Sequence, residues 1–350
     1  MSQRRIRIGH IGTAHDHSAD FFECVRRHPE LFEIVGVVEP DEQRRKLARE
    51  QGKFQNAPWM TEEELAQAGV DAVLVETFEL DLVPTAARWA QRGVHLHIDK
   101  PAGDNLEEFG KVLNIAREKS LVVQMGYMYR YNRGVQYALE LVRSGELGEI
   151  YQVEAVMNTC HPLEKREWLR GLPSGEMFFL GCHMVDLVYL IQGMPKRVVP
   201  FNASTGFDGV DCVDFGMALF EYDRGVSTVQ ATSVEVNGYG RRRLAVYGSK
   251  GTIEIKPLEC PNGRNEFAGG GYDASPVTLS LLSNSQTYRN CSQEIVLKPQ
   301  GGRYDEMMQD FYNFVTGEKQ NPYSYDYEYQ VEKLVLAACG QISLEKGANS

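Results

Sequence analysis

The sequence predicts an α/β domain with a parallel sheet, followed by an α+β domain with a large, mainly antiparallel sheet. Short apolar runs alternate with helical patterns from residue 6 to residue 125, as they do in a parallel sheet covered by helices. After Tyr131 the apolar runs become longer and no regular helix alternates with them, which indicates antiparallel pairing. At 350 residues the chain also exceeds the size at which a single core stops growing.

Five apolar runs in the first part predict its strands. They cover residues 6–11, 33–38, 70–75, 94–98 and 121–125. Helix boundaries lie between them, because Thr61 with Glu64 forms a capping box and Asp104 with Glu107 resembles one. Gly93 follows a helical stretch as a glycine follows the end of a helix.

The second part begins with a helix over residues 134–144. It continues with strands over residues 150–157, 213–222, 227–236, 243–247 and 252–255. Two helical patterns, 304–315 and 327–338, follow. We therefore predict two domains, residues 1–127 and 128–350, with C-terminal helices that can pack back on the first domain.

Composition and charge argue against several classes of protein. A net charge of −11 argues against a nucleic-acid binder, which needs a basic surface. No apolar stretch is long enough to span a bilayer, and Met1 to Arg7 is not followed by the apolar core of a signal peptide. The seven cysteines are scattered without a CxxC pair, which favours reduced thiols. We expect a cytoplasmic protein that binds neither membranes nor nucleic acids.

The loop after the first strand reads Gly12-Thr13-Ala14-His15-Asp16-His17. A dinucleotide-binding fold has G-x-G-x-x-G there, which lets the backbone approach the pyrophosphate. Only the first glycine remains; Ala14 still permits close approach, whereas His17 either loosens helix–strand packing or contributes its ring to the site. Glu39 ends the second strand, where an acid would bind ribose hydroxyls and disfavour a 2′-phosphate. This favours NAD over NADP; the alternative is a surface acid that caps the strand.

His15 and His17 could also be metal ligands. No third ligand is evident nearby in the sequence, so we expect no metal here. Cys160-His161 and Cys182-His183 could be drawn as a zinc set, but their spacing matches no standard motif.

Asp99-Lys100-Pro101 directly follows the apolar run 94–98 and places a lysine at the carboxyl end of a parallel strand. Ligands of open α/β sheets bind at that edge. The proline biases the lysine toward an extended backbone, which fixes the direction of its ammonium group. The alternative is an ordinary turn.

His183 and Asp186 are three residues apart, so on a helix they share one face. A histidine at the start of such a helix suits proton transfer near neutral pH. The alternative is a core histidine bonded to a backbone carbonyl.

Four motifs together resemble the glucose–fructose oxidoreductase, inositol dehydrogenase and rhizopine-catabolism (Gfo/Idh/MocA) family. They are Asp99-Lys100-Pro101, Gly126 to Asn132, Gly181 to Asp186, and Tyr247 to Thr252. The resemblance implies an N-terminal Rossmann domain and a C-terminal domain whose open sheet serves oligomerisation, as a dimer or tetramer. It also implies NAD(P)-dependent oxidation or reduction at a carbinol carbon of a sugar, cyclitol or related polyol.

By position, Lys100 would match the family lysine that contacts the reacting hydroxyl, and His183 would match the catalytic histidine. Two departures indicate a divergent branch. Phe179 stands where many members carry an aspartate, and Glu176 or Asp186 could substitute for it. The segment Thr77-Phe78-Glu79 replaces the family's Thr-Pro-Asn.

These observations predict an NAD-dependent dehydrogenase that acts on a secondary alcohol of a sugar, glycoside or cyclitol. One alternative is a glycosidase or lyase that oxidises a sugar C3 transiently with NAD and then eliminates an aglycone. A second is a non-catalytic sugar- or nucleotide-binding protein. The predicted substrate-binding residues are Tyr127, Arg130, Asn158, Trp168 and Asp186. The predicted cofactor-binding residues are Gly12, Thr13, Ala14, His15, His17, Glu39, Thr77, Phe78, Asp99 and Lys100.

Overall fold

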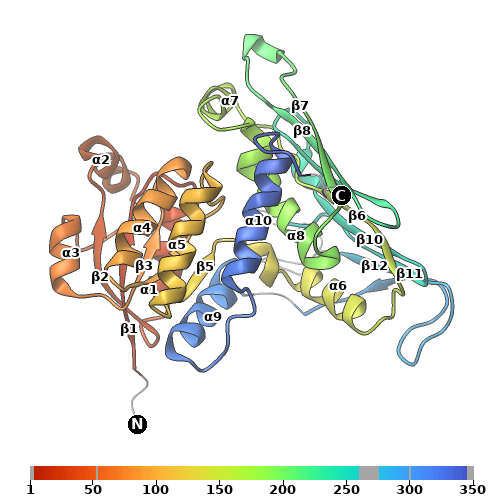
Figure 1. The fold of residues 1–350 in the computed structure, drawn as a ribbon, viewed down its shortest axis with the longest axis horizontal. Coiled ribbons are helices and arrows are strands. Elements are labelled where there is room, and N and C mark those ends of the chain that lie inside the picture. Colours follow the sequence, from red (N-terminus) through yellow and green to blue (C-terminus); the bar gives the residue numbers. More distant parts are fainter. Residues whose placement is uncertain (1–3, 53, 260–275, 299–300, 345–350) are drawn as a thin grey trace, which may run out of the picture. The chain divides into compact units, whose positions relative to one another are not determined.

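The structure is a computed structural model that describes residues 4–52, 54–259, 276–298 and 301–344 (Figure 1). The chain divides into two compact units. The first unit comprises residues 1–127 and 304–332, and the second comprises residues 128–303 and 333–350. The segment 304–332 therefore returns to the N-terminal part of the chain.

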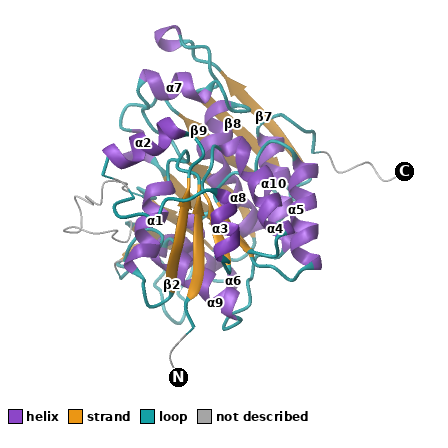
Figure 2. Cartoon of the chain, turned by 90° about the vertical axis from the view of Figure 1, so that its left-hand side faces the viewer, coloured by secondary structure: helices purple, strands orange, loops and turns teal. Residues whose placement is uncertain are grey.

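The first unit contains a five-stranded parallel sheet in the order β2-β1-β3-β4-β5, of which β2 is labelled in Figure 2. Its strands are β1 (Ile6–Ile11), β2 (Phe32–Val38), β3 (Ala72–Val75), β4 (His95–Ile98) and β5 (Val123–Met125). All five correspond to predicted runs, and the parallel arrangement is confirmed. Every residue of β3 is buried, as expected for a strand covered on both faces.

Helices connect and cover these strands. They are α1 (Ser18–Arg27), α2 (Glu42–Glu50), α3 (Glu62–Ala68), α4 (Leu82–Gln91), α5 (Leu106–Glu118), α9 (Asp305–Thr316) and the first part of α10 (Tyr325–Ala338). The chain moves one way in the sheet from β1 to β2 and the other way from β3 to β5. Right-handed crossovers therefore place α1 on one face and α4 and α5 on the other.

Local signals explain most helix ends. The capping box of Thr61 and Glu64 forms as predicted, and Gly93 follows α4 with φ +79°. The second cap was assigned to the wrong residue. Asn105, not Asp104, caps α5, because the Asn105 side chain accepts hydrogen bonds from two backbone amides of the first helical turn.

The segment 304–332 completes the core of the first unit through aromatic contacts. The ring of Tyr304 lies 4.3 Å from that of Phe21 on α1. On α9, Tyr312 packs edge-on against Phe32 with ring centroids 6.1 Å apart. The faces of α1 and β2 that would otherwise meet water are thus covered by residues from far along the chain.

The sheet order also determines where this unit can bind a ligand. The direction of the strand order reverses at β1, which has β2 on one side and β3 on the other. The carboxyl ends of strands beside such a reversal form a crevice that binds ligands in open α/β sheets. The loops that follow β1, β3 and β4 therefore belong to the candidate site.

The second unit contains an eight-stranded sheet in the order β13-β12-β11-β10-β6-β9-β8-β7. Its strands are β6 (Ile150–Val156), β7 (Arg197–Ala203), β8 (Phe215–Glu221), β9 (Val226–Thr232), β10 (Arg243–Gly248), β11 (Gly251–Ile255), β12 (Val277–Leu281) and β13 (Ser292–Ile295). Among the described strands only β6 and β9 pair in parallel, so the sheet is mainly antiparallel as predicted.

Three strands of this sheet, β7, β12 and β13, were not predicted from the sequence. The two edge strands, β7 and β13, have weak apolar patterns, because β7 contains Pro200 and β13 reads Ser-Gln-Glu-Ile. Edge strands face solvent on more sides and need less apolar surface. The alternation in β12 is clear, with Val277, Leu279 and Leu281 buried.

Helices of the second unit lie along one side of its sheet (Figure 1). They include α6 (Arg133–Arg143), α7 (Leu163–Leu169) and α8 (Cys182–Gln192), which a π-helical turn over Met177–Gly181 precedes. Along β8, Gly216, Ala218 and Phe220 are buried while the alternate residues are partly exposed. The sheet therefore has one covered face and one face that is only partly shielded.

Within the described residues, no helix is both long enough and apolar enough to cross a membrane.

A buried acid ties α10 to the loop after β4 within the first unit. The Glu332 carboxylate accepts a hydrogen bond of 2.9 Å from the backbone amide of Ala102. Burial raises the pKa of Glu332 to about 8, against the opposing effect of that hydrogen bond. Between its ordinary pKa and this value the folded protein holds a proton that the unfolded chain releases.

We expect this proton to make stability fall as the pH rises. From about pH 4.5 to pH 8, Glu332 should lower the free energy of unfolding by up to about 1.4 kcal/mol per pH unit. Glu332→Gln keeps an acceptor for Ala102 and removes the titration, so its stability relative to the wild type should increase across this range. Urea denaturation at pH 5, 6.5 and 8 measures the difference, and a constant difference would contradict the assignment.

Candidate functional site

Six charged or titratable residues meet at the carboxyl edge of the parallel sheet. His15 and His17 come from the loop after β1, Glu76 follows β3, and Lys100 follows β4. Asp99 and Glu79 complete the group. None of the six is more than 9% exposed, and Glu76, Glu79, Asp99 and Lys100 are completely buried.

Asp99 lies at the centre of this group. Its Oδ2 is 2.8 Å from Nδ1 of His15 and 3.1 Å from Nδ1 of His17. Its Oδ1 accepts a hydrogen bond of 2.7 Å from the backbone amide of Lys100. The other ring nitrogen of His15, Nε2, is 3.0 Å from the carbonyl oxygen of Lys100. Together these contacts join the loop after β1 to the loop after β4.

Two further acids flank His15. Oε2 of Glu76 lies 4.0 Å from Nδ1 of His15, and Oε1 of Glu79 lies 3.7 Å from Nε2. Neither acid was a predicted site residue, and no third partner for His15 and His17 was evident in the sequence, whereas the fold supplies Asp99. Glu76 could have been found, because it directly follows a buried strand, as Asp99 does.

Burial and neighbouring charges shift the pKa values in this group in opposite directions. Burial lowers the pKa of His17 to about 3, although Asp99 opposes it. Burial also acts to lower the pKa of His15, but the Asp99 carboxylate and Glu79 outweigh it, and the pKa of His15 is raised. The two histidines hold the pKa of Asp99 well below its usual range despite its burial. Burial and the charge of Asp99 raise the pKa of Glu76 well above its usual range.

A cavity of about 500 Å³ lies at the carboxyl ends of β1, β2 and β3. Among the predicted cofactor-binding residues, Glu39 and Thr77 line it, and two arginines, Arg45 and Arg88, share its wall. The position after β2 is where a dinucleotide-binding fold holds the adenosine ribose. The cavity therefore fits the adenosine half of a dinucleotide.

The glycine loop fits a dinucleotide less fully. Gly12 has φ +91°, and a Cβ there would meet the Glu76 backbone at 2.7 Å, so this glycine is required. However, the amide of Thr13 is bonded to the Glu39 carboxylate at 2.8 Å. The amide of His15 is bonded to the carbonyl of Glu76 at 3.2 Å, and that of His17 to Nδ1 of His15 at 3.3 Å. Backbone donors that would face a pyrophosphate thus have partners within the protein.

Two other predicted cofactor residues, Ala14 and Phe78, are partly exposed. The carboxylate of Glu39 also accepts bonds from the Thr13 hydroxyl at 2.7 Å and from the Asp41 amide at 3.0 Å. It is therefore held in one orientation at the edge of the cavity.

In the second unit, His183 lies in the first turn of α8 and is 1% exposed. The ring of Tyr129 packs edge-on against it, with ring centroids 5.1 Å apart. One turn further on, Asp186 forms a buried ion pair with Arg130, at 2.7 Å between Nη2 and Oδ1. Three of the predicted residues, His183, Arg130 and Asp186, are thus gathered around α8.

Phe179 belongs to an aromatic group on the same unit. Its ring lies 5.2 Å from that of Trp168, and the ammonium of Lys165 lies 3.5 Å from the Trp168 ring centroid and 4.3 Å from that of Phe179. Oε2 of Glu176 is 3.6 Å from Nε2 of His161. Of the two acids considered as substitutes at this position, Asp186 pairs with Arg130, and Glu176 with His161.

The remaining predicted residues take separate places. Asn158 is buried, and its backbone carbonyl oxygen accepts a hydrogen bond of 3.1 Å from Nε of Arg242. Tyr127 is buried at the end of the first unit. Lys100 and His183 belong to different units. Among the described residues, Cys160, His161, Cys182 and His183 do not form a metal-ligand group.

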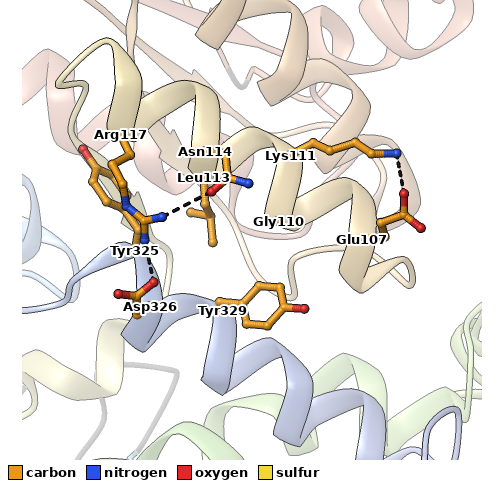
Figure 3. Close-up of a pocket in the computed structure, with 9 residues that line it drawn as sticks. All are labelled: Glu107, Gly110, Lys111, Leu113, Asn114, Arg117, Tyr325, Asp326 and Tyr329. Atoms are coloured by element: carbon orange, nitrogen blue, oxygen red, sulfur yellow. Dashed lines mark hydrogen bonds and ion pairs between the residues drawn. The ribbon is translucent and has the colours of Figure 1, made fainter.

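A second hollow, of about 360 Å³, lies between α5 and α10 (Figure 3). Lys111 bonds Glu107 at 2.8 Å at one end, and Arg117 bonds Asp326 at 2.5 Å at the other. None of the predicted site residues lines it. We therefore regard it as a surface feature, which the ion pair of Arg117 and Asp326 bridges from α5 to α10.

Comparison with known proteins agrees with this architecture. Residues 6–127 match the family described as "Oxidoreductase family, NAD-binding Rossmann fold", and residues 135–254 match the "GFO/IDH/MocA C-terminal domain". The D-xylose 1-dehydrogenase (NADP(+)) 2 of Haloferax volcanii is 27% identical over 201 residues, which cover 56% of this chain and 60% of that protein. The scyllo-inositol 2-dehydrogenase (NADP(+)) of Bacillus subtilis is 24% identical over 136 residues, 38% of each protein.

Similarity thus extends over less than two thirds of these two relatives. An oxidoreductase from Thermotoga maritima has the same fold, with a TM-score of 0.74, 20% sequence identity and 96% coverage of both chains. The two matched domains, in this order and over most of the chain, show that the protein belongs to the Gfo/Idh/MocA family of NAD(P)-binding oxidoreductases.

Proposed function

We propose that this protein is an NAD-dependent dehydrogenase that acts on a secondary alcohol of a sugar, glycoside or cyclitol. The observation that carries the proposal is the cavity at the carboxyl ends of β1, β2 and β3, with Glu39 on its wall. NAD would accept or donate hydride at the substrate carbon. The similarity to xylose and inositol dehydrogenases supports this substrate class.

Lys100 and His183 would act on the oxygen of the reacting carbon. A buried ammonium group stabilises negative charge on that oxygen more strongly than an exposed one, because water screens it less. Lys100 is completely buried and follows β4 at the ligand edge of the sheet. His183 would take the hydroxyl proton, or return it in the reverse direction.

Arg130 and Asp186 would support His183 rather than replace a catalytic carboxylate. Both side chains of this ion pair are 1% exposed. Removing one partner of such a pair leaves an uncompensated buried charge. The ring of Tyr129 packs edge-on against the imidazole of His183. Trp168 and Asn158 remain candidates for contact with the sugar.

Phe179 favours a second candidate function. An apolar ring stands where many relatives carry the carboxylate that accompanies the histidine, so the proton chemistry of this protein differs from theirs. A lyase that oxidises a sugar carbon transiently and then eliminates an aglycone would use Lys100 and His183 without net consumption of NAD. Net formation of NADH with a sugar or cyclitol distinguishes the dehydrogenase from this lyase.

Glu39 should determine the choice between NAD and NADP. The wild type should bind NAD more tightly, because the carboxylate repels a 2′-phosphate. Glu39→Ser should weaken NAD binding by about tenfold, the loss of a charge-assisted hydrogen bond, and should reduce the preference over NADP. Calorimetric titration with both dinucleotides measures this, with exposed Glu42→Ser on α2 as the matched control. Tighter binding of NADP by the wild type would overturn the assignment.

Lys100→Met should lower kcat/KM by about 10²- to 10⁴-fold while NAD binding remains measurable, because the variant keeps the volume and removes the charge at the reacting oxygen. A panel of sugars, cyclitols and glycosides, monitored at the nicotinamide absorbance, provides the substrate. Lys111→Met on α5 is the matched control, since its side chain is 64% exposed. Normal turnover in the Lys100 variant would refute the catalytic role.

We also propose that the protein is a cytoplasmic homo-oligomer, a dimer or tetramer, that pairs through the partly exposed face of the large sheet. Phe201 on β7 is 52% exposed and Tyr151 on β6 is 43% exposed, and exposed large apolar side chains mark interaction surfaces where they form a patch. Light scattering should show a dimer or tetramer for the wild type and a smaller species for Phe201→Glu. Lys250→Glu, at an exposed turn, should leave the mass unchanged.

A further inference from the structure

We propose that His15, His17 and Asp99, with Glu76 as a fourth ligand, bind one divalent transition-metal ion at the carboxyl edge of the parallel sheet. The site lies wholly within the first unit. It goes beyond the proposed dehydrogenase function, because it requires neither substrate nor dinucleotide.

The spacing of the donor atoms suits a metal ion. One donor atom from each of His15, His17 and Asp99 lies within 4.8 Å of the others. Oδ2 of Asp99 is 2.8 Å from Nδ1 of His15 and 3.1 Å from Nδ1 of His17. Ligands of a tetrahedral Zn²⁺ site at about 2.0–2.2 Å from the ion are roughly 3.4 Å from one another. Small side-chain shifts would therefore admit an ion between these three groups.

Glu76 provides an independent indication that a cation belongs here. Its side chain is completely buried, and neither of its carboxylate oxygens accepts a hydrogen bond from the described residues. Burying a carboxylate without partners costs several kcal/mol. Oε2 of Glu76 lies 4.0 Å from Nδ1 of His15, on the side where Asp99 also lies. A metal ion bound to His15 and Asp99 would also lie close to this carboxyl group, whose polar neighbours include those same two residues.

The groups behind the proposed ligands are arranged as outer-shell partners. Nε2 of His15 is 3.0 Å from the Lys100 carbonyl oxygen, which can only accept a hydrogen bond, so Nε2 carries the proton. Nδ1 then has a lone pair, which accepts the His17 amide at 3.3 Å here and can bind a metal ion in its place. Glu79 lies 3.7 Å from the same Nε2. The Lys100 amide donates to Oδ1 of Asp99, which leaves Oδ2 for the ion. Histidine ligands of metals are usually oriented in this way.

The charge balance and the donor types select the class of ion. Glu76, Glu79 and Asp99 bring three carboxylates into a buried group whose ammonium comes from Lys100. Metal ligation requires both imidazoles to be neutral, so the positive charge that balances the ligand carboxylates comes from the ion. Two imidazoles with carboxylates favour Zn²⁺, Fe²⁺ or Co²⁺, whereas Mg²⁺ and Ca²⁺ prefer oxygen ligands alone.

A second group of possible ligands in the same unit offers a control. Cys24, His28 and Asp305 also bring three donor atoms within 4.8 Å. There, however, Oδ1 of Asp305 is bonded to Arg27 at 2.8 Å. Burial, together with Asp305, raises the pKa of Cys24 to about 12, so the sulfur remains a thiol. We expect no metal at this second group.

Metal binding can be measured on the full chain without NAD or sugar. The protein, purified without a histidine tag, is stripped with a chelator and titrated with Zn²⁺ in competition with a chromogenic chelator. Co²⁺ replaces Zn²⁺ in a parallel titration, and its visible absorption reports coordination by imidazole and carboxylate. The wild type should bind one equivalent of either ion.

His17→Gln is the main test variant, because the His17 side chain is the most exposed of the ligands, at 11%. It should weaken Zn²⁺ binding on the order of 100-fold or more, while Glu79→Gln should weaken it by about 10- to 100-fold. Far-UV circular dichroism shows whether each variant is folded. His28→Gln, the matched control at the second group, should bind Zn²⁺ as the wild type does.

Three results would overturn the proposal: a wild type that binds no Zn²⁺ or Co²⁺, a folded His17→Gln that binds as tightly as the wild type, or loss of the ion from His28→Gln. None of these results bears on NAD binding or turnover. Failure of the dehydrogenase proposal would likewise leave the metal measurement intact.

Discussion

The buried carboxylate of Asp99 is the feature on which the ligand edge of the first unit depends. A buried charge needs hydrogen bonds and opposite charges around it, and Asp99 obtains them from His15, His17 and the Lys100 amide. These partners tie the loop after β1 to the loop after β4. Gly126, after β5, leaves the necessary room, because a Cβ there would approach Oδ1 of Asp99 to 2.5 Å. The direction of Lys100 therefore depends on the hydrogen bonds and charges that surround the neighbouring Asp99.

The second unit also contains a buried carboxylate, Asp186, whose charge is balanced by an arginine. Asp186 follows His183 by one turn of α8 and is neutralised by Arg130 from the segment before α6. The two charges of this pair face each other, and the ring of Tyr129 packs edge-on against the imidazole of His183. Each unit therefore has its own buried polar centre, and the polar chemistry of each can be altered separately by mutation.

Periodicity and strand-end rules predicted much of this architecture, because both depend on local sequence. The five parallel strands, the Thr61 capping box and the location of Lys100 after β4 all follow from residues close together in the chain. The contact between His15 and Asp99 does not, since it depends on β3 lying beside β1 and on β4 lying beside β3 in the sheet. A search for a third ligand among sequence neighbours could not find a partner from another strand. Glu76 was not predicted either, although its position directly after the buried strand β3 was a usable signal.

The return of residues 304–332 to the first unit has a consequence for the order in which the protein folds. Tyr304 and Tyr312 cover Phe21 and Phe32, yet the whole of segment 128–303 is synthesised between the two parts of this unit. At translation rates of about 5–20 residues per second, that interval is on the order of 10–35 s. During this interval the apolar surface of α1 and β2 is not yet covered by residues 304–316. The nascent N-terminal unit is therefore a natural substrate for chaperones, and truncation before α9 removes a part of its core.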